Sequence, residues 1–370
     1  MKLLWVTARR FGVDHCQTTQ LSLAKHMVSM GWEIQFICPN NCSPPEDLTN
    51  ISFQGTGIGG PPGLRGPLFE MAVKKRIKRL LKEYSPDAAI VDWRCTVGSR
   101  SELNKKGIPW FIIDRGPPAH SGILAKLQKI HYRKSWKAAS KSASGGFVVS
   151  RKHAEYIKRN HSNEMKLHEV PAGVDVERFT PKEKFNDSIR MVYHGRVDKN
   201  RNVDKLIPLV ERVRELGVDC ELVIIGDGNA LKNFNHVSRN NDWLKIIGPI
   251  PPDQIPSELS RCQIGVIPMG ETENWKLASP LKLFEYAAAG LAIIGVDIEA
   301  HKAFGEVEWV RLFPSSEFIS KGAIQIHEWT KDKQLFQRFS KEAITLVQSN
   351  HSWEKSARTI DSILREKSFK

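Results

Sequence analysis

The residues best suited to chemistry lie in the stretch ENWKLASPLKLFEYAAAG, at positions 273–290. If this stretch forms a helix, its first turn presents free backbone N–H groups at Leu281 and Lys282 and the positive end of the helix dipole. Such a terminus binds anions, and two adjacent amides suit a diphosphate. Glu285 follows one turn deeper, where its carboxylate can accept two hydrogen bonds from a ribose diol.

The same stretch also carries the signals of an ordinary helix that precedes a strand. Ser279 is a typical N-cap, Pro280 fits the first helical position, and Gly290 is a typical stop. This plainer interpretation explains the caps. It does not explain why Lys282 and Glu285 interrupt an otherwise apolar helix, so we assign the helix start to ligand binding.

A second segment, YHGRVDKNRNVDKLI at 193–207, offers cationic side chains at the end of an expected strand. Gly195 allows a tight turn there. Arg196 and Arg201 follow in the loop, and the arginine fork is well matched to phosphate oxygens. The alternative is a solvated surface turn, which the intervening lysine and asparagines fit well.

These residues need a scaffold that brings strand ends and helix starts together, and the hydrophobic pattern provides one. Short apolar runs, typical of strands buried on both faces, alternate with helical stretches in both halves of the chain. In the first half the expected strands are 3–6, 34–37, 88–91, 110–113 and 146–149, and the expected helices are about 16–30, 68–83, 97–105 and 120–142. In the second half they are 190–193, 221–225, 244–247, 264–267, 292–295 and 310–312, with helices near 202–216, 253–261, 280–289, 332–348 and 352–366.

Such alternation predicts an α/β protein with two doubly wound, Rossmann-like domains and a cleft between them. The boundary falls in a stretch rich in Pro and Gly near 170–181. We therefore expect an N-terminal domain over 1–170 and a C-terminal domain over 171–350, followed by a last segment over 351–370.

Read together, the motifs resemble a known family, the retaining glycosyltransferases of GT-B fold called family four or glycosyl transferases group 1. This family includes sucrose synthases, bacterial mannosyltransferases and lipopolysaccharide glucosyltransferases. The resemblance covers most of residues 146–368. It rests on GVDVERF (173–179), GRVDKNRNVDKLI (195–207), IIGDG (224–228), GPIPPDQIPSELSRCQIGVIP (248–268), the SPLKLFEY variant of the donor-site motif (279–286) and Ser352 with Trp353. The last two resemble the start of the family's helix that crosses back to the N-terminal domain, which implies that 351–370 packs on that domain.

The resemblance implies a role for each matching residue. Arg196 and Arg201 are expected to contact the diphosphate of a nucleotide sugar, Ile250 to lie beside the nucleobase, and Glu285 to bind the ribose. Gly12, Gly195, Ser279, Pro280, Leu281 and Lys282 complete the expected donor-binding set. In three places the chain departs from the usual pattern: position 201 usually holds lysine, position 202 usually holds glycine, and an acid usually occupies the position of Leu277.

The resemblance further implies transfer with retention of configuration, from a UDP-, GDP- or ADP-linked sugar to a glycan or lipid-linked acceptor. No cofactor is expected. No metal site is expected either, since the Asp-x-Asp motif of metal-dependent transferases is missing and the cysteines form no CxxC pair. For catalysis on the acceptor side we select Asp114 and His120 in IIDRGPPAH (112–120), with His15 as a second histidine candidate.

Charge separates the two halves of the chain. Residues 1–170 carry 27 Lys and Arg against 13 Asp and Glu, whereas residues 171–370 carry 28 of each. The basic residues concentrate in 71–84 and 124–141, where apolar residues recur at helical spacing. Solvated helix faces account for this pattern. The one-sided charge favours a sharper interpretation, an anionic membrane surface as partner of the first half.

Other classes fit less well. A dehydrogenase needs GxGxxG after the first strand, and only Gly12 is present there. Nucleic-acid binding lacks a reading motif, so none is expected. A nucleotide-sugar epimerase and a non-catalytic protein of the same fold remain open alternatives, the latter because of Leu277. The N-terminus lacks an apolar run of secretory length, so we expect a cytoplasmic protein, peripheral on the inner face of the membrane.

Overall fold

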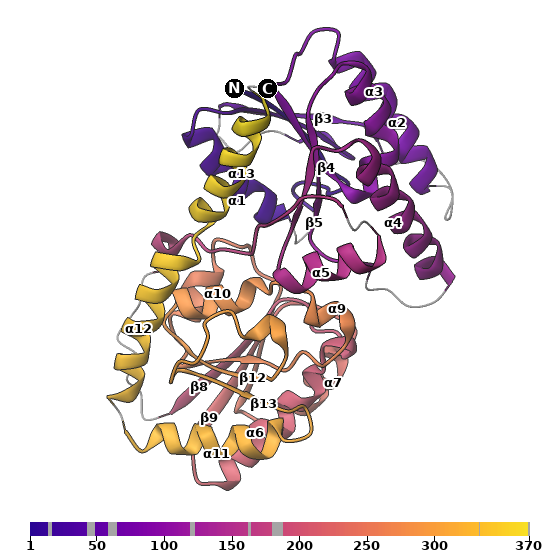
Figure 1. Ribbon diagram of the computed structural model, residues 1–370. Helices are drawn as coiled ribbons and strands as arrows, with labels where there is room; N and C mark the ends of the chain where they lie inside the picture. Colours follow the sequence, from indigo (N-terminus) through magenta and orange to yellow (C-terminus); the bar gives the residue numbers. More distant parts are fainter. Residues whose placement is uncertain are drawn as a thin grey trace. The chain divides into compact units, whose positions relative to one another are not determined.

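Figure 1 shows the computed structural model, which describes residues 1–13, 17–42, 49–57, 65–118, 123–161, 164–179, 188–332 and 334–368. The chain divides into two compact units. One consists of Met1–Pro171 together with Trp353–Lys370, and the other is Ala172–Ser352. None of the described helices is both long enough and apolar enough to cross a membrane.

The first unit is built on a parallel sheet in the order β3-β2-β1-β4-β5-β6-β7, as far as its residues are described. Its strands are β1 (Lys2–Val6), β2 (Glu33–Cys38), β3 (Ile51–Gly55), β4 (Ala88–Asp92), β5 (Trp110–Asp114), β6 (Gly145–Val148) and β7 (Leu167–Glu169). The central strands β4, β5 and β6 are buried along their whole length. This burial explains their uninterrupted apolar sequence, since helices cover both faces of the sheet.

The helices of the first unit are α1 (Gln17–Ser29), α2 (Arg65–Leu80), α3 (Thr96–Lys105), α4 (Ile123–Ser142), α5 (Arg151–Asn160) and α13 (Trp353–Ser368), with a 3₁₀ turn η1 (Trp93–Cys95). Figure 1 shows α2, α3 and α4 on one side of the sheet and α1 with α13 on the other. Alternate strand residues divide accordingly. Leu4, Val91 and Ile112 pack with Val73 of α2 and Trp136 of α4 in one buried cluster.

The second unit has a parallel sheet in the order β10-β9-β8-β11-β12-β13 within its described residues. The strands are β8 (Ile189–His194), β9 (Cys220–Ile225), β10 (Leu244–Gly248), β11 (Ile264–Ile267), β12 (Ala292–Val296) and β13 (Val310–Phe313). The helices are α6 (Leu206–Glu215), α7 (Leu231–Ser238), α8 (Ile255–Leu259), α9 (Glu273–Lys276), α10 (Leu281–Ala288), α11 (Phe318–Thr330) and α12 (Leu335–Asn350). The 3₁₀ turns are η2 (Val176–Arg178), η3 (Lys199–Arg201), η4 (Val203–Lys205) and η5 (Glu299–His301).

The predicted fold class, two Rossmann-like parallel sheets with alternating helices, is confirmed. Gly290 also ends helix α10 as predicted, with a left-handed φ of 67°. The predicted start of that helix is wrong by one residue. Pro280 occupies the N-cap position and the helix begins at Leu281, while the Ser279 hydroxyl instead accepts a hydrogen bond of 2.9 Å from the backbone N–H of Ala172.

Candidate functional site

In the second unit, the residues selected from the sequence follow strand β8 and begin helix α10, at the carboxyl edge of the sheet. Gly195 directly follows β8 and has a φ of 104°, a conformation that side chains disfavour. It is exposed, and the Lys282 amine of α10 lies 3.6 Å from where a Cβ on Gly195 would be. Because Gly195 has no side chain, a ligand bound over the loop can approach the Lys282 amine at this point.

Arg196 lies next along the loop, and its guanidinium is engaged by a carboxylate. Its Nε and Nη2 donate to the two oxygens of Asp198 at 3.1 and 3.0 Å, and Asp227 lies 3.8 Å away. The hydrogen bond and charge of Asp198 raise the pKa of Arg196. The side chain is still 43% exposed, so the arginine is oriented by Asp198 with a large part of its surface free to meet a ligand.

Arg201, at the end of η3, has its guanidinium over an aromatic ring that was not among the predicted site residues. Its guanidinium carbon is 4.5 Å from the centre of the Trp275 ring of α9, and its Nη1 contacts the Met269 sulfur at 3.6 Å. The Trp275 indole N–H in turn donates to the Asn200 carbonyl at 3.1 Å. Stacking of this kind suits the planar guanidinium, and a lysine could not reproduce it.

Asn202 explains how the loop tolerates the loss of the usual glycine. Its φ is 53°, the left-handed conformation that asparagine adopts more readily than other residues with side chains. A Cβ at Gly270 would overlap the Asn202 amide, so a second glycine makes room for this side chain. The asparagine at position 202 is thus accommodated because residue 270 is a glycine.

Helix α10 places three polar residues beneath the loop. Lys282 is 7% exposed and its Nζ is 3.9 Å from the centre of the Tyr193 ring. Glu285 is partly buried, with one carboxylate oxygen 3.2 Å from Nε2 of His194 but not aligned for a hydrogen bond. Burial raises the pKa of Glu285 to about 7, against the opposing charges of Arg178 and Lys282.

Ile250, expected beside a nucleobase, lies two residues beyond β10 and is half-buried. Gly248 ends that strand with a φ of 75°. Arg178 reaches the same loop, where its Nη2 donates to the Pro252 carbonyl at 2.8 Å. Arg178 therefore lies near both the loop of Ile250 and the Glu285 carboxylate, on which its charge acts.

In the first unit, two of the selected residues can be placed. Gly12 is exposed in a turn with a φ of 79°. Asp114 ends β5 and is fully buried. The histidine candidates His15 and His120 lie outside the described residues.

The Asp114 carboxylate is enclosed by donors. It accepts hydrogen bonds from the Tyr132 hydroxyl (2.5 Å), the Trp136 indole (3.0 Å) and the Gly116 backbone (2.8 Å). His153, also fully buried, lies 3.4 Å away. Burial alone raises the pKa of Asp114, but His153 and the hydrogen bonds from Tyr132 and Gly116 outweigh it and lower the pKa. We reassign Asp114 from catalysis to holding the turn after β5, because no part of its carboxylate is exposed.

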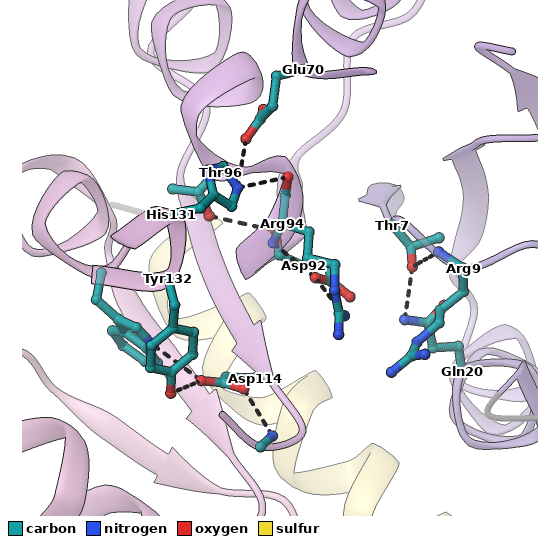
Figure 2. A network of polar contacts seen from close by, with 12 residues as sticks. Thr7, Arg9, Gln20, Glu70, Asp92, Arg94, Thr96, Asp114, His131 and Tyr132 are labelled. Carbon is teal, nitrogen blue, oxygen red and sulfur yellow. Dashed lines mark hydrogen bonds and ion pairs between the residues drawn. The ribbon is translucent and has the colours of Figure 1, made fainter. Parts of the chain in front are cut away.

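Figure 2 shows a polar network at the carboxyl ends of the neighbouring strands β1, β4 and β5. Thr7 accepts a hydrogen bond from Gln20 at 3.0 Å, and Asp92 caps η1 by accepting from the Arg94 backbone at 2.9 Å. The Arg94 guanidinium lies 4.4 Å from the centre of the Trp93 ring and is 37% exposed.

Two further members of the network lie behind η1. His131 of α4 is 3.3 Å from Glu70 of α2, which also accepts from the Gly98 backbone at 2.5 Å. Asp92 and Arg94 were not predicted as site residues, although they directly follow the expected strand 88–91. Their position alone was the available signal, since ligands of such sheets bind beyond strand ends.

Comparison with known proteins adds to this geometry. Residues 188–322 match the family model described as Glycosyl transferases group 1, and residues 17–178 match the model described as Glycosyltransferase Family 4. No curated protein matches the sequence.

Solved structures match over nearly the whole chain. Sucrose-phosphate synthase from Thermosynechococcus elongatus has a TM-score of 0.79 at 15% identity, over 99% of this chain and 98% of that one. Anabaena HepE, in complex with UDP and glucose, has a TM-score of 0.75 at 12% identity over 99% of both chains. A TarM variant of S. aureus, in complex with fondaparinux, alpha-GlcNAc-glycerol and UDP, has a TM-score of 0.74 at 9% identity, over 98% and 99%.

Proposed function

We propose that this chain, a hexosyltransferase-type glycosyltransferase of GT-B fold, moves a sugar from a nucleoside diphosphate to a glycan or lipid-linked acceptor with retention of configuration. Its membership of the group 1 glycosyltransferases is the premise, given by the two family models. Donor, stereochemistry and acceptor are the proposal. HepE and TarM, which share the fold, were crystallised with UDP, and this supports a nucleotide-sugar donor.

One observation carries the proposal: Arg196, Arg201 and the N-terminus of α10 gather at the carboxyl edge of a single sheet, with Glu285 one turn further along the helix. The two guanidinium groups and the free amides of Leu281 and Lys282 suit a diphosphate. Glu285 suits the ribose, and Ile250 offers an apolar surface to the base.

In the proposed reaction the acceptor oxygen bonds to the anomeric carbon on the face that the diphosphate leaves. The bond from that carbon to the diphosphate breaks, and the departing diphosphate takes the hydroxyl proton. Negative charge develops on the leaving group, where fixed cations and helix amides stabilise it. Leu277 is buried and apolar, so contacts to the sugar fall on the backbone of residues 277–281.

A thermal-shift panel of UDP-, GDP- and ADP-linked sugars tests the donor directly. A ligand that binds only the folded protein raises its stability by mass action, by about 2.7 kcal/mol at a hundred times its Kd. One nucleotide class is expected to raise the melting temperature at millimolar concentration. No shift with any of the three contradicts the proposed donor.

We predict that transfer does not depend on a divalent cation, because arginines and helix amides neutralise the leaving group. Activity is expected to persist within about twofold in excess EDTA, on the assumption that fixed donors supply the stabilisation a metal otherwise gives. The measurement is the initial rate with the identified donor, with and without EDTA. Complete loss of activity, restored by magnesium, contradicts the prediction.

The exposed faces of helices α2 and α4 support an anionic membrane surface as a further partner. A peripheral location on the inner face of the membrane would place the protein beside a lipid-linked acceptor. Among their described side chains, the large apolar ones that are exposed are Leu68, Met71, Leu127 and Ile130, at 41–68%. Residues 126–130 of α4 are all exposed. Apolar side chains that project among lysines and arginines suit insertion at a charged interface.

Reversing two charges, Lys126→Glu with Lys129→Glu, is expected to weaken binding to anionic vesicles at low salt by at least about thirtyfold. Each basic residue contributes about 1 kcal/mol near such a surface. Co-sedimentation with phosphatidylglycerol vesicles measures the change, and Lys232→Glu with Lys245→Glu in the second unit is the matched control. Equal recovery of the wild-type protein with neutral and anionic vesicles excludes the membrane role.

A further inference from the structure

The amine of Lys282 is buried and, among the described residues, makes no hydrogen bond. Burial of an amine without a partner is unfavourable, because the group loses its hydration and gains nothing in return. Among the described residues, the amine contacts the face of the Tyr193 ring, whose centre is 3.9 Å away. An unpaired amine in the first turn of α10, beside the exposed Gly195, points to a ligand that completes it.

The titratable groups that act on this amine, or on which it acts, lie on η3, α10, β8 and η5. Arg201 of η3 opposes its charge and Glu285 of α10 favours it, while burial has the largest effect and holds the pKa of Lys282 well below its usual range. His194, at the end of β8, and His301 of η5 are buried, and the charge of the amine acts on the pKa of both. Burial followed by the charge of Lys282 lowers the pKa of His194 to about 3, and burial lowers that of His301 to about 4. Both histidines are therefore neutral at neutral pH.

Neither histidine makes a hydrogen bond with the Lys282 amine. Nδ1 of His301 is 2.7 Å from the Val296 carbonyl, while its Nε2 is buried and makes no described hydrogen bond. Nε2 of His194 is likewise buried without one. Three buried nitrogen atoms, Nζ of Lys282 and Nε2 of each histidine, thus lack hydrogen-bond partners among the described residues. Of these three groups, Lys282 is the amine, which becomes an ammonium when it is protonated.

The way out of this buried group passes Gly195. That residue is exposed and has no side chain, and the space a Cβ would take lies within 4 Å of both Nζ and Cε of Lys282. Lys282 itself belongs to the first turn of α10, where the backbone amides of Leu281 and Lys282 have no partner within the helix. A phosphate oxygen bound at these amides and Gly195 is within reach of the amine.

We propose that the Lys282 side chain is a third cation of the donor site, which hydrogen-bonds a phosphate oxygen of the bound nucleoside diphosphate and takes up a proton from solvent as that ligand binds. The inference rests on the proposed function and deepens it. Because the ligand favours the protonated amine, affinity falls as the pH rises above the pKa of the free amine. It reaches its maximum below that pKa, where the amine is already charged.

The alternative is a lysine that only packs against Tyr193, and the two readings make opposite predictions for Lys282→Met. Methionine keeps an apolar stem of similar length and removes the unpaired amine. For a ligand-binding lysine, the free variant is more stable than the wild-type protein and binds the diphosphate less tightly. For a packing lysine, stability falls with the lost contact and affinity is unchanged.

Calorimetry with UDP, GDP and ADP in two buffers of different ionisation enthalpy, with thermal melts of the free proteins, provides the test. For Lys282→Met and Lys282→Gln we expect at least tenfold weaker binding of the preferred diphosphate and a smaller proton uptake than in the wild-type protein. Because the charge of Lys282 also acts on the pKa of Glu285, proton uptake is judged together with the loss of affinity. Lys341→Met, an exposed lysine of α12, is the control and should change neither quantity.

The outcomes separate the inference from the function on which it rests. If the wild-type protein binds none of the three diphosphates, the proposed function fails and the inference with it. If the wild-type protein binds and both variants match it in affinity and proton uptake, the inference alone is overturned. A free Lys282→Met protein with a lower melting temperature than the wild type also counts against it.

Discussion

Replacing Arg201 with methionine is expected to lower kcat for glycosyl transfer by about 10²–10³-fold, the usual effect of removing one fixed donor from the site where charge develops. The expectation is large because this guanidinium is held in place before the ligand arrives. Its stacking on Trp275 and its contact with Met269 limit its freedom, so little reorganisation is needed at the moment of bond breaking. Initial rates with saturating donor measure the change.

Two further variants make the result specific. Arg201→Lys keeps the charge without the planar fork and is expected to recover only part of the rate. Arg212→Met removes an exposed arginine of α6 that pairs with Glu215 on the surface, and its kcat should match the wild type. An Arg201→Met enzyme within threefold of wild-type kcat is incompatible with a role in stabilising the leaving group.

Asp114→Ala is expected to destabilise the first unit by about 3–5 kcal/mol, since leaving a buried donor without its acceptor costs about 1–3 kcal/mol and several donors share this carboxylate. Its carboxylate is the shared acceptor for Tyr132 and Trp136 and the partner of His153, and these groups lose it together. The melting temperature should fall by roughly 6–20 °C. Asp219→Ala, at an exposed aspartate of the second unit, should leave it nearly unchanged.

The pH dependence of the same residue has a definite sign. Its pKa is lower in the folded protein than in the unfolded chain, so its stabilising contribution is present above the unfolded value of about 3.9 and is lost as the pH falls through the folded value. The difference in stability between wild type and Asp114→Ala should therefore shrink only in acid. Loss of activity at an unchanged melting temperature would restore the catalytic assignment that its burial led us to abandon.

Sequence pattern was sufficient for the strands that are buried on both faces and insufficient at the edges. The runs at 88–91 and 264–267 appear as β4 and β11 because helices cover both of their faces. The edge strand β7 was missed, since it is three residues long and contains His168 and Glu169. Helix α5 was missed for a related reason: only two of its residues, His153 and Ile157, are buried.

Helix α11 was missed although it is apolar, and its glycine explains the error. Gly322 lies in the middle of the helix, where glycine is unfavourable. In the structure a Cβ there would lie 3.3 Å from Leu209 of α6 and 3.4 Å from Ile294 of β12. The glycine permits close packing, which is a property of three elements and cannot be inferred from one of them.

The candidate site was predictable where its residues are consecutive and was not where they come together from separate segments. The loop after β8 and the start of α10 could be selected from motif order. The stacking of Arg201 on Trp275, the fork between Arg196 and Asp198, and the isolation of the Lys282 amine all depend on the positions of different loops. The arginines could be predicted from the sequence pattern, whereas Trp275 and Asp198, which orient them, could not.

The composition of the first unit, residues up to Pro171 joined by helix α13, has a consequence for the order in which the protein can fold. The Trp32 indole donates to Asp361 at 2.6 Å, and Arg365 donates to the Met30 carbonyl at 2.8 Å. These contacts cannot form until the last helix has been synthesised. The second unit is continuous in sequence, and its residues are all synthesised before α13. In a nascent chain the second unit can therefore fold while the first unit still lacks helix α13.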